Sequence, residues 1–354
     1  MVVKGTIVRG AVGLAMALAV AGAVPAYAAG TGTFEQINLV SDQPGVAALT
    51  DPALVNGWGL SHGPNTPIWV SDNGSDQTTL YRTDVAGSSV TKVLSVAIPG
   101  GAPTGQVFNS GSGFNVPGTT TPSRFIFAGE DGFISAWAGG AAATMVGGQM
   151  PDSVFKGLAL VQSPTGPLLL AANFGANRID AWNSSWTLVS TPSMFRDPNL
   201  PAGYAPFNVA EINGQVFVTY AKQDATLHDD VAGPARGFID VYTTSGGFVK
   251  RFATHGVLNS PWGMTLAPAS FGQFGGDLLV GNFGDGRIHV FNPQTGAVLG
   301  VLRGTSGGPL VIDGLWGLTV GTQVAGGTES VWFSAGPNGE SHGLLGRLQP
   351  AANG

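Results

Sequence analysis

A short sequence frame recurs six times along the 354-residue chain, and it limits the possible folds more than any other feature. Each copy has a large side chain, then Gly or Asn, then an aliphatic residue that opens a short apolar run. The copies are Trp58-Gly59-Leu60, Phe114-Asn115-Val116, Lys156-Gly157-Leu158, Phe207-Asn208-Val209, Trp262-Gly263-Met264 and Trp316-Gly317-Leu318. Their middle residues lie 42 to 56 positions apart. Six units of this length are typical of the blades of a propeller.

Each unit continues with a second apolar run, and most units have a third run in which polar and apolar residues alternate. Residues 133–137 and 287–291 are clear examples of this alternation, which is typical of a half-buried strand. Four strands in a unit, with no Pro/Ser-rich linker between units, favour a closed ring over an array of sandwiches. We therefore predict an all-β, six-bladed β-propeller. Residues 34–39 are expected to add the outer strand of the last blade, which ends at 343–348.

The first 28 residues have the pattern of a secretory signal peptide. Lys4 and Arg9 precede an uncharged apolar run over 11–24, and Ala26-Tyr27-Ala28 supplies the small residues before a cleavage point. The run is shorter than the ~20 residues that span a bilayer, and no later run reaches that length. We expect a cleaved signal peptide over 1–28, one propeller domain over 29–354, no membrane span, and a secreted or periplasmic location.

The amino-acid composition limits the kinds of partner that the protein can bind. The chain has 15 basic and 21 acidic residues and no Lys/Arg cluster after the signal peptide, which argues against a nucleic-acid surface. It has no cysteine, so burial alone must hold the fold and no thiol can bind a metal. A small molecule or a peptide remains as the expected partner, and a propeller of this kind is expected to be a monomer.

Two families resemble the chain. The frame Pro261-Trp262-Gly263-Met264, followed by residues 278–282 and 287–291, resembles the NHL repeat, which builds six-bladed propellers of the NHL/TolB-like kind. Nearly the whole chain after residue 28 resembles a family of secreted NHL-like propeller proteins of bacteria and giant viruses. The matching stretches are residues 38–42, 56–60, 69–74, 102–109, 197–201 and 219–224. The resemblance implies a six-bladed fold and export, and it carries no activity.

The first residues of the six frames are expected to form a collar at one end of the channel, because the first strand of a blade lines it. The collar residues are Trp58, Phe114, Lys156, Phe207, Trp262 and Trp316. Five aromatic rings and one cation suit an apolar or planar anionic ligand. They differ from the oxygen ligands that calcium-dependent sugar-acid lactonases, also six-bladed, carry near this position. The alternative is packing between neighbouring blades.

Four oxygen-bearing side chains at the ends of second strands form a candidate metal site. They are Asp72, Glu130, Asn173 and Asn282. Ca²⁺ prefers such oxygen ligands, and no HExxH-type spacing supports Zn²⁺, so the divalent metal indicated is calcium rather than zinc. The alternative is that each residue caps its own turn.

One loop, over residues 222–236, concentrates charge in a chain that has only 10% charged residues. A shorter stretch at 338–342 parallels it in the last unit, and both are expected on the face of the collar. The candidate catalytic residues are Lys222, Asp224, His228, Asp229, Glu340 and His342. Imidazoles and carboxylates suit acid–base catalysis or a metal-activated water, and the alternative is a solvated loop with internal salt bridges.

Two functions therefore stay open. One is a small-molecule hydrolase or lyase with its site at the channel mouth. The other is a propeller without turnover that binds a ligand or another protein.

Overall fold

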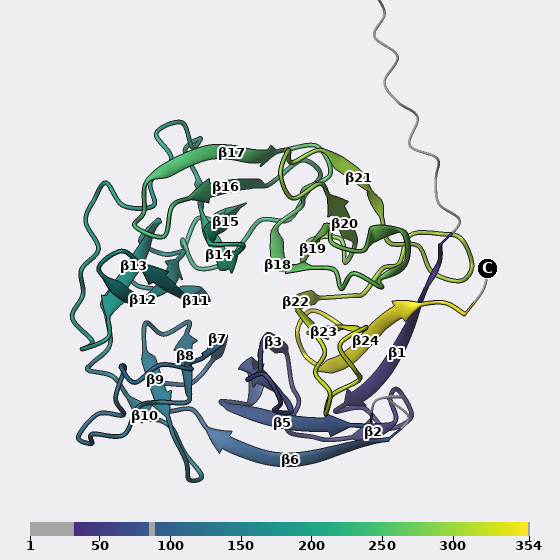
Figure 1. Cartoon of the computed structure of the whole chain (residues 1–354), viewed down its shortest axis with the longest axis horizontal. Helices are drawn as coiled ribbons and strands as arrows, with labels where there is room; N and C mark the ends of the chain where they lie inside the picture. Colours follow the sequence, from purple (N-terminus) through teal and green to yellow (C-terminus); the bar gives the residue numbers. More distant parts are fainter. Residues whose placement is uncertain (1–31, 85–88, 353–354) are drawn as a thin grey trace, which may run out of the picture. The chain divides into compact units, whose positions relative to one another are not determined.

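Six β-sheets surround a common channel in the computed structural model, which describes residues 32–84 and 89–352 (Figure 1). The prediction of an all-β, six-bladed β-propeller is confirmed. The expected signal peptide lies outside the described residues. No helix in the described part of the chain is long and apolar enough to cross a membrane.

The strands follow one another from the channel outward. Blade 1 contains β3 (Gly57–Ser61), β4 (Ile68–Asp72), β5 (Gln77–Thr83) and β6 (Val90–Ala97), with the short helix η1 (Asn73–Ser75) after β4. Blade 2 contains β7 (Pro103–Phe108), β8 (Phe125–Gly129), β9 (Ile134–Trp137) and β10 (Thr144–Met145). Blade 3 contains β11 (Phe155–Ser163), β12 (Gly166–Asn173) and β13 (Arg178–Asn183).

The other half of the ring is built in the same way. Blade 4 contains β14 (Tyr204–Ile212), β15 (Gln215–Lys222), β16 (Phe238–Tyr242) and β17 (Phe248–Thr254). Blade 5 contains β18 (Pro261–Leu266), η2 (Gly272–Phe274), β19 (Leu278–Asn282), β20 (Ile288–Phe291) and β21 (Val298–Val301). Blade 6 contains β22 (Leu315–Val320), β23 (Val331–Ala335), β24 (Leu344–Pro350), β1 (Phe34–Ser41) and β2 (Leu49–Thr50).

Blade 6 closes the ring with strands from both ends of the described chain. β1 pairs antiparallel with β24, from Phe34 opposite Pro350 to Ser41 opposite Leu344. The short β2 runs parallel to β1 at the outer edge. The expectation that residues 34–39 supply an outer strand of the last blade is confirmed.

Blade 3 differs from the others because its sheet has three strands. After β13 the chain enters a link over residues 184–203, which runs along the outside of the ring where a fourth strand would lie (Figure 1). Only local contacts tie the link to β13, including a hydrogen bond from the Val189 N–H to the Ala181 carbonyl at 2.8 Å. The edge of blade 3 is therefore covered by irregular chain.

Every innermost strand carries a register shift near its start, where an extra residue bulges out of the ladder. A β-bulge redirects a side chain, and here it redirects one from each blade. The bulged residues are Trp58, Thr104, Lys156, Phe207, Trp262 and Trp316. The next residue is Gly in five blades and Asn208 in the sixth, which lets neighbouring inner strands approach closely.

The prediction that Phe114 belongs to the collar is wrong. Phe114 lies in the connection between β7 and β8, has a φ of 57°, and packs its ring against Trp186 with centroids 5.0 Å apart. The blade 2 frame is Thr104-Gly105-Gln106, which lacks the large first side chain of the other copies. The sequence of residues 114–116 resembles the frame by chance, because an aromatic residue followed by Asn also occurs in the loop between β7 and β8.

Candidate functional site

Six aromatic residues fill one end of the channel, and we call them the plug. They are Trp58, Phe174, Phe207, Trp262, Phe283 and Trp316. Trp58 and Trp316 stack with centroids 3.5 Å apart, Phe283 stacks on Trp316 at 4.0 Å, and Trp262 meets Trp58 edge-on at 6.0 Å. The predicted collar residues do converge, but their rings pack against one another, so they do not form an open ring for a ligand.

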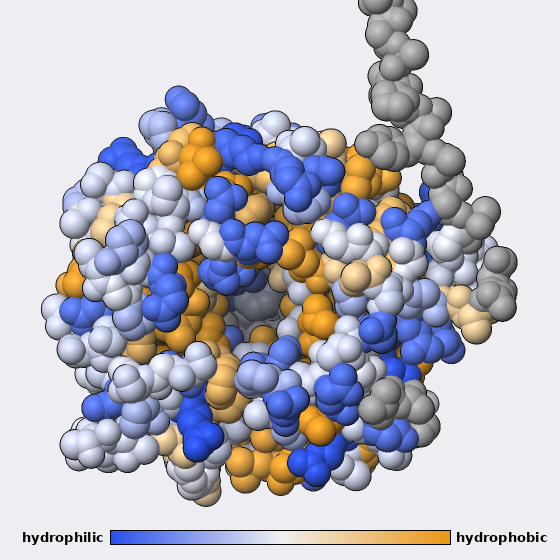
Figure 2. Space-filling model, in the orientation of Figure 1, coloured by the Kyte–Doolittle hydropathy of each residue, from blue (hydrophilic) through white to orange (hydrophobic). Residues whose placement is uncertain are grey.

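Beyond the plug the channel stays hollow. A cavity of about 350 Å³ is lined by the inner strands after their bulges, with Trp262 as part of its wall. Figure 2 shows the hollow at the centre of the ring, with hydrophilic and hydrophobic residues both at its rim. The plug therefore separates this cavity from the loops that follow the second strands.

Lys156 stands beside the plug with its ammonium group in contact with two carboxylates. Its side chain is 2% exposed, and Nζ lies 5.1 Å from the Trp58 ring centroid. Nζ donates to Glu130 Oε1 and, at 3.2 Å, to Asp229 Oδ1. Burial works to lower the pKa of Lys156, but the two carboxylates outweigh it and hold the pKa above its ordinary value. The buried ammonium therefore keeps its charge.

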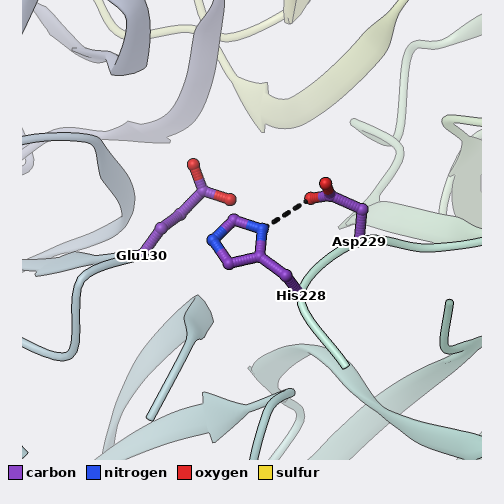
Figure 3. Close-up of side chains that lie close together, drawn as sticks. All are labelled: Glu130, His228 and Asp229. Atoms are coloured by element: carbon purple, nitrogen blue, oxygen red, sulfur yellow. Dashed lines mark hydrogen bonds and ion pairs between the residues drawn. The ribbon is translucent and has the colours of Figure 1, made fainter. Parts of the chain in front are cut away.

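Glu130, His228 and Asp229 bring their ligating atoms within 4.8 Å of one another (Figure 3). Glu130 directly follows β8, whereas His228 and Asp229 are neighbours in the long loop between β15 and β16. His228 Nδ1 lies 2.9 Å from Asp229 Oδ1. The two side chains are 44% and 67% exposed, so a small molecule can reach them.

Two amide side chains next to the strands of blade 1 connect Glu340 of blade 6 to this group. Asn56 donates from Nδ2 to Asn73 Oδ1 at 3.1 Å and to Glu340 Oε1 at 3.2 Å. Asn73 in turn donates to Glu130 Oε2 at 2.8 Å. We call the connected set the mouth cluster. It consists of Asn56, Asn73, Glu130, Lys156, His228, Asp229 and Glu340.

The pKa values of two carboxyl groups in the mouth cluster are shifted in opposite directions. Burial works to raise the pKa of Asp229, but Lys156 and the hydrogen bond from His228 outweigh it and hold the pKa below its ordinary value. Burial raises the pKa of Glu340, and the hydrogen bond from Asn56 offsets only part of this. Carboxyl groups with opposite shifts can serve as anion and proton donor in one site.

Three of the predicted catalytic residues lie in the mouth cluster and three have other contacts. Asp224 folds its own loop, because its Oδ1 accepts the N–H groups of Thr226 and His228, each at 3.1 Å. It thereby positions His228 without joining the cluster. His342 Nδ1 lies 2.7 Å from Asp42 Oδ2, and Lys222 ends β15, where its carbonyl accepts the Val231 N–H.

The four predicted calcium ligands are not brought together. Asp72, Asn173 and Asn282 are fully buried, each in its own blade, and only Glu130 reaches the mouth cluster. Asn173 Oδ1 accepts the Ala176 N–H at 3.0 Å, which is the turn-capping alternative. Asp72 lies in an environment where burial raises its pKa well above its usual range, so its carboxylate charge is disfavoured.

Sequence reasoning missed four residues here: Asn56, Asn73, Phe174 and Phe283. The two phenylalanines carry a repeated signal, since Asn173-Phe174-Gly175 and Asn282-Phe283-Gly284 both follow a second strand. Asn56 and Asn73 resemble ordinary turn residues in sequence, and only the closure of the ring places them between Glu130 and Glu340.

Lys156 occupies the position in which a metal ion would neutralise Glu130 and Asp229. We therefore expect the melting temperature of the wild-type protein to be the same in EDTA and in millimolar Ca²⁺ or Zn²⁺. In Lys156→Met the two carboxylates lose their cation, and an added metal should raise the melting temperature by several degrees because it binds only the folded state. A metal-dependent rise in the wild type that Lys156→Met abolishes would contradict this expectation.

No known family model matches the chain. The uncharacterised protein L690 of Acanthamoeba polyphaga mimivirus is 32% identical over 329 residues, covering 88% of this chain and 84% of its own. The uncharacterised protein R648 of the same virus is 33% identical over 296 residues, covering 79% of this chain and 72% of its own.

Solved structures share the fold at low identity. A streptogramin B lyase is 12% identical with a TM-score of 0.53, covering 90% of this chain and 98% of its own. A catalytically inactive His-to-Ala variant of virginiamycin B lyase from Staphylococcus aureus, solved with quinupristin, is 11% identical with a TM-score of 0.50, covering 90% of this chain and 99% of its own. These likenesses establish the six-bladed propeller fold and nothing finer.

Proposed function

The chain belongs to the family of the mimivirus proteins L690 and R648, and we propose that it is an acid–base enzyme, a lyase or a hydrolase, acting on a small molecule at the mouth cluster. We also propose that it works outside the cytoplasm, because residues 1–28 have the pattern of a signal peptide. The supporting observation is the contact of His228 Nδ1 with Asp229 Oδ1 at 2.9 Å beside Glu130.

His228 is the proposed general base. The Asp229 carboxylate accepts the Nδ1–H, which leaves Nε2 free to take a proton from the substrate. The charged Lys156 keeps Asp229 anionic, as the lowered pKa of that carboxyl indicates. Asp224 acts as a positioning residue, because it holds the backbone of the loop that carries His228.

Glu340 is the proposed proton donor. Burial raises its pKa above the ordinary value, so this carboxyl group holds a proton more readily than an ordinary glutamic acid does. A base and an acid in one cluster are what bond cleavage with proton transfer to the leaving group requires. The solved lyases with the same fold are consistent with this reaction class but do not assign it.

The test is turnover of quinupristin and of a panel of simple esters and lactones, followed by mass spectrometry. His228→Asn should lower the turnover number at least about 100-fold, because general-base catalysis contributes roughly 10²–10⁴-fold. The matched control is His255→Asn, since His255 is exposed and its Nδ1 lies 2.6 Å from the Ala235 carbonyl oxygen. Turnover of His228→Asn at the wild-type rate would overturn the proposal.

A second candidate function is ligand binding without turnover. One observation favours it: Glu130, Lys156 and Asp229 already satisfy one another, as they would in a structural ion-pair network. Calorimetry separates the two functions. A compound of the panel that binds with the same affinity to wild type and His228→Asn, and yields no product, would favour binding alone.

A further inference from the structure

A second cavity, of about 600 Å³, lies between blades 3 and 4. Its walls come from β13, from the link over residues 184–203, and from Pro206 and Tyr220 of blade 4. It lies where blade 3 lacks a fourth strand, because the link pairs with β13 only briefly, at residues 187–189, and forms no strand there. The cavity has the size of ordinary small-molecule sites and is separate from the mouth cluster.

The wall of this cavity combines apolar and polar side chains and is held in place by buried contacts. Leu188, Met194 and Leu200 line it together with Phe195, whose ring meets Tyr242 at 5.8 Å. The Phe195 N–H donates to the Gly246 carbonyl at 2.8 Å, which fastens the link to blade 4. Asp197 Oδ1 accepts the Asn199 N–H at 2.9 Å and shapes the turn that follows. The cavity is therefore preformed, and its apolar side chains suit the apolar part of a ligand.

One of the charged residues that line the cavity has no ion-pair partner in the described part of the chain. Asp180 is paired with Arg178 at 2.6 Å, and Asp197 is paired with Arg251. Arg196 also lines the cavity and is exposed, and it has no ion-pair or hydrogen-bond partner for its side chain within residues 32–84 and 89–352. The one charged lining residue without a partner in the described part of the chain is therefore a cation.

We propose that the cavity between blades 3 and 4 is a binding site for a small organic anion, a molecule with an apolar body and one acidic group. The body packs against Leu188, Met194 and Phe195, and the acidic group binds the guanidinium of Arg196, which offers paired donors to an anion. A cationic ligand is disfavoured, since it would have to replace Arg178 or Arg251 at a carboxylate that is already paired.

A matched pair of probes tests the proposal. 8-Anilinonaphthalene-1-sulfonate carries a negative charge, and N-phenyl-1-naphthylamine has the same rings without it; both fluoresce more strongly in apolar sites. The folded wild-type protein should bind the anion at one saturable site and more tightly than the neutral probe. Arg196→Gln should weaken binding of the anion about threefold to fivefold, the effect of one exposed ion pair, and leave the neutral probe unchanged.

Three further variants locate the site. Arg303→Gln is the matched control, because Arg303 is an exposed arginine on another blade, and it should bind both probes as the wild type does. Ala202→Trp and Thr191→Trp each fill the cavity from an exposed lining position, and both should remove binding of both probes with the melting temperature kept. His228→Asn should bind as the wild type does.

Unchanged binding of the anion by Arg196→Gln would overturn the charge assignment. Unchanged binding by a folded tryptophan variant would overturn the site itself. Loss of binding in His228→Asn would move the probe to the mouth cluster and would also overturn it.

Discussion

Replacing Arg251 by leucine is expected to lower the free energy of unfolding by about 3–5 kcal/mol, because removing one partner of a buried ion pair leaves uncompensated charge. Arg251, in β17, binds the carboxylates of both Asp197 and Asp240, whose side chains are 1% and 0% exposed. Tyr242 adds only a long hydrogen bond to Asp240, at 3.4 Å. Urea unfolding measures the loss. The control Arg303→Leu, at an exposed site, should change stability by less than ~0.5 kcal/mol.

The loss caused by Arg251→Leu should be larger at high pH. Burial raises the pKa of Asp240 from an ordinary 3.8 to about 7, although Arg251 works to lower it. The folded state thus holds this proton more tightly than the unfolded chain, and stability falls as the pH rises between these two values. Without Arg251 the folded pKa rises further and the fall continues above pH 7. Equal losses at about pH 5 and pH 8 would contradict this assignment.

Replacing Gly105 by alanine is expected to lower the free energy of unfolding by about 3 kcal/mol or more. A methyl group at this position in β7 would lie 2.3 Å from the Leu158 nitrogen and 2.7 Å from the Gly157 carbonyl carbon. Both atoms belong to the backbone of β11 in the next blade, which cannot move away without opening the ring. Urea unfolding again measures the effect.

Gly139→Ala provides the matched control for Gly105→Ala. A methyl group at Gly139 meets no atom within 4 Å, so the substitution should leave stability unchanged or raise it slightly by restricting the unfolded chain. Equal stability of the two variants would show that the space between the inner strands can hold a methyl group at residue 105, which would contradict the prediction.

Much of the fold was predictable because each blade of a propeller repeats the same strand pattern and the same contact with its neighbour. The Gly or Asn after each bulge must fit against the inner strand of the next blade. The sequence frame is therefore recognisable in five of the six blades. The frame of blade 2 was wrongly assigned to residues 114–116, because Thr104 replaces the large residue that begins the other copies. The missing fourth strand of blade 3 could not be predicted either. The link over residues 184–203 contains apolar residues, and these resemble a weak strand in the sequence.

The site was predictable only in its loops. His228, Asp229 and Glu340 stood out because charge is scarce in this chain, and a common face of the ring brings them together. The role of Lys156 depended on two contacts that only a closed ring sets, one to Glu130 in the blade before it and one to Asp229 in the blade after it. Asp224 has the composition of a catalytic residue and the geometry of a turn cap, and sequence cannot separate the two.

The pairing of β1 with β24 also affects the order in which the chain can fold. Phe34 and Pro350 are direct partners although almost the whole chain lies between them. Contacts of such long range form late and slow the folding of a chain. While the ribosome is still making blade 6, β1 has no partner on the side where β24 will lie, and an open strand edge can pair with another chain. The nascent protein is therefore most vulnerable to aggregation just before its last strand is complete.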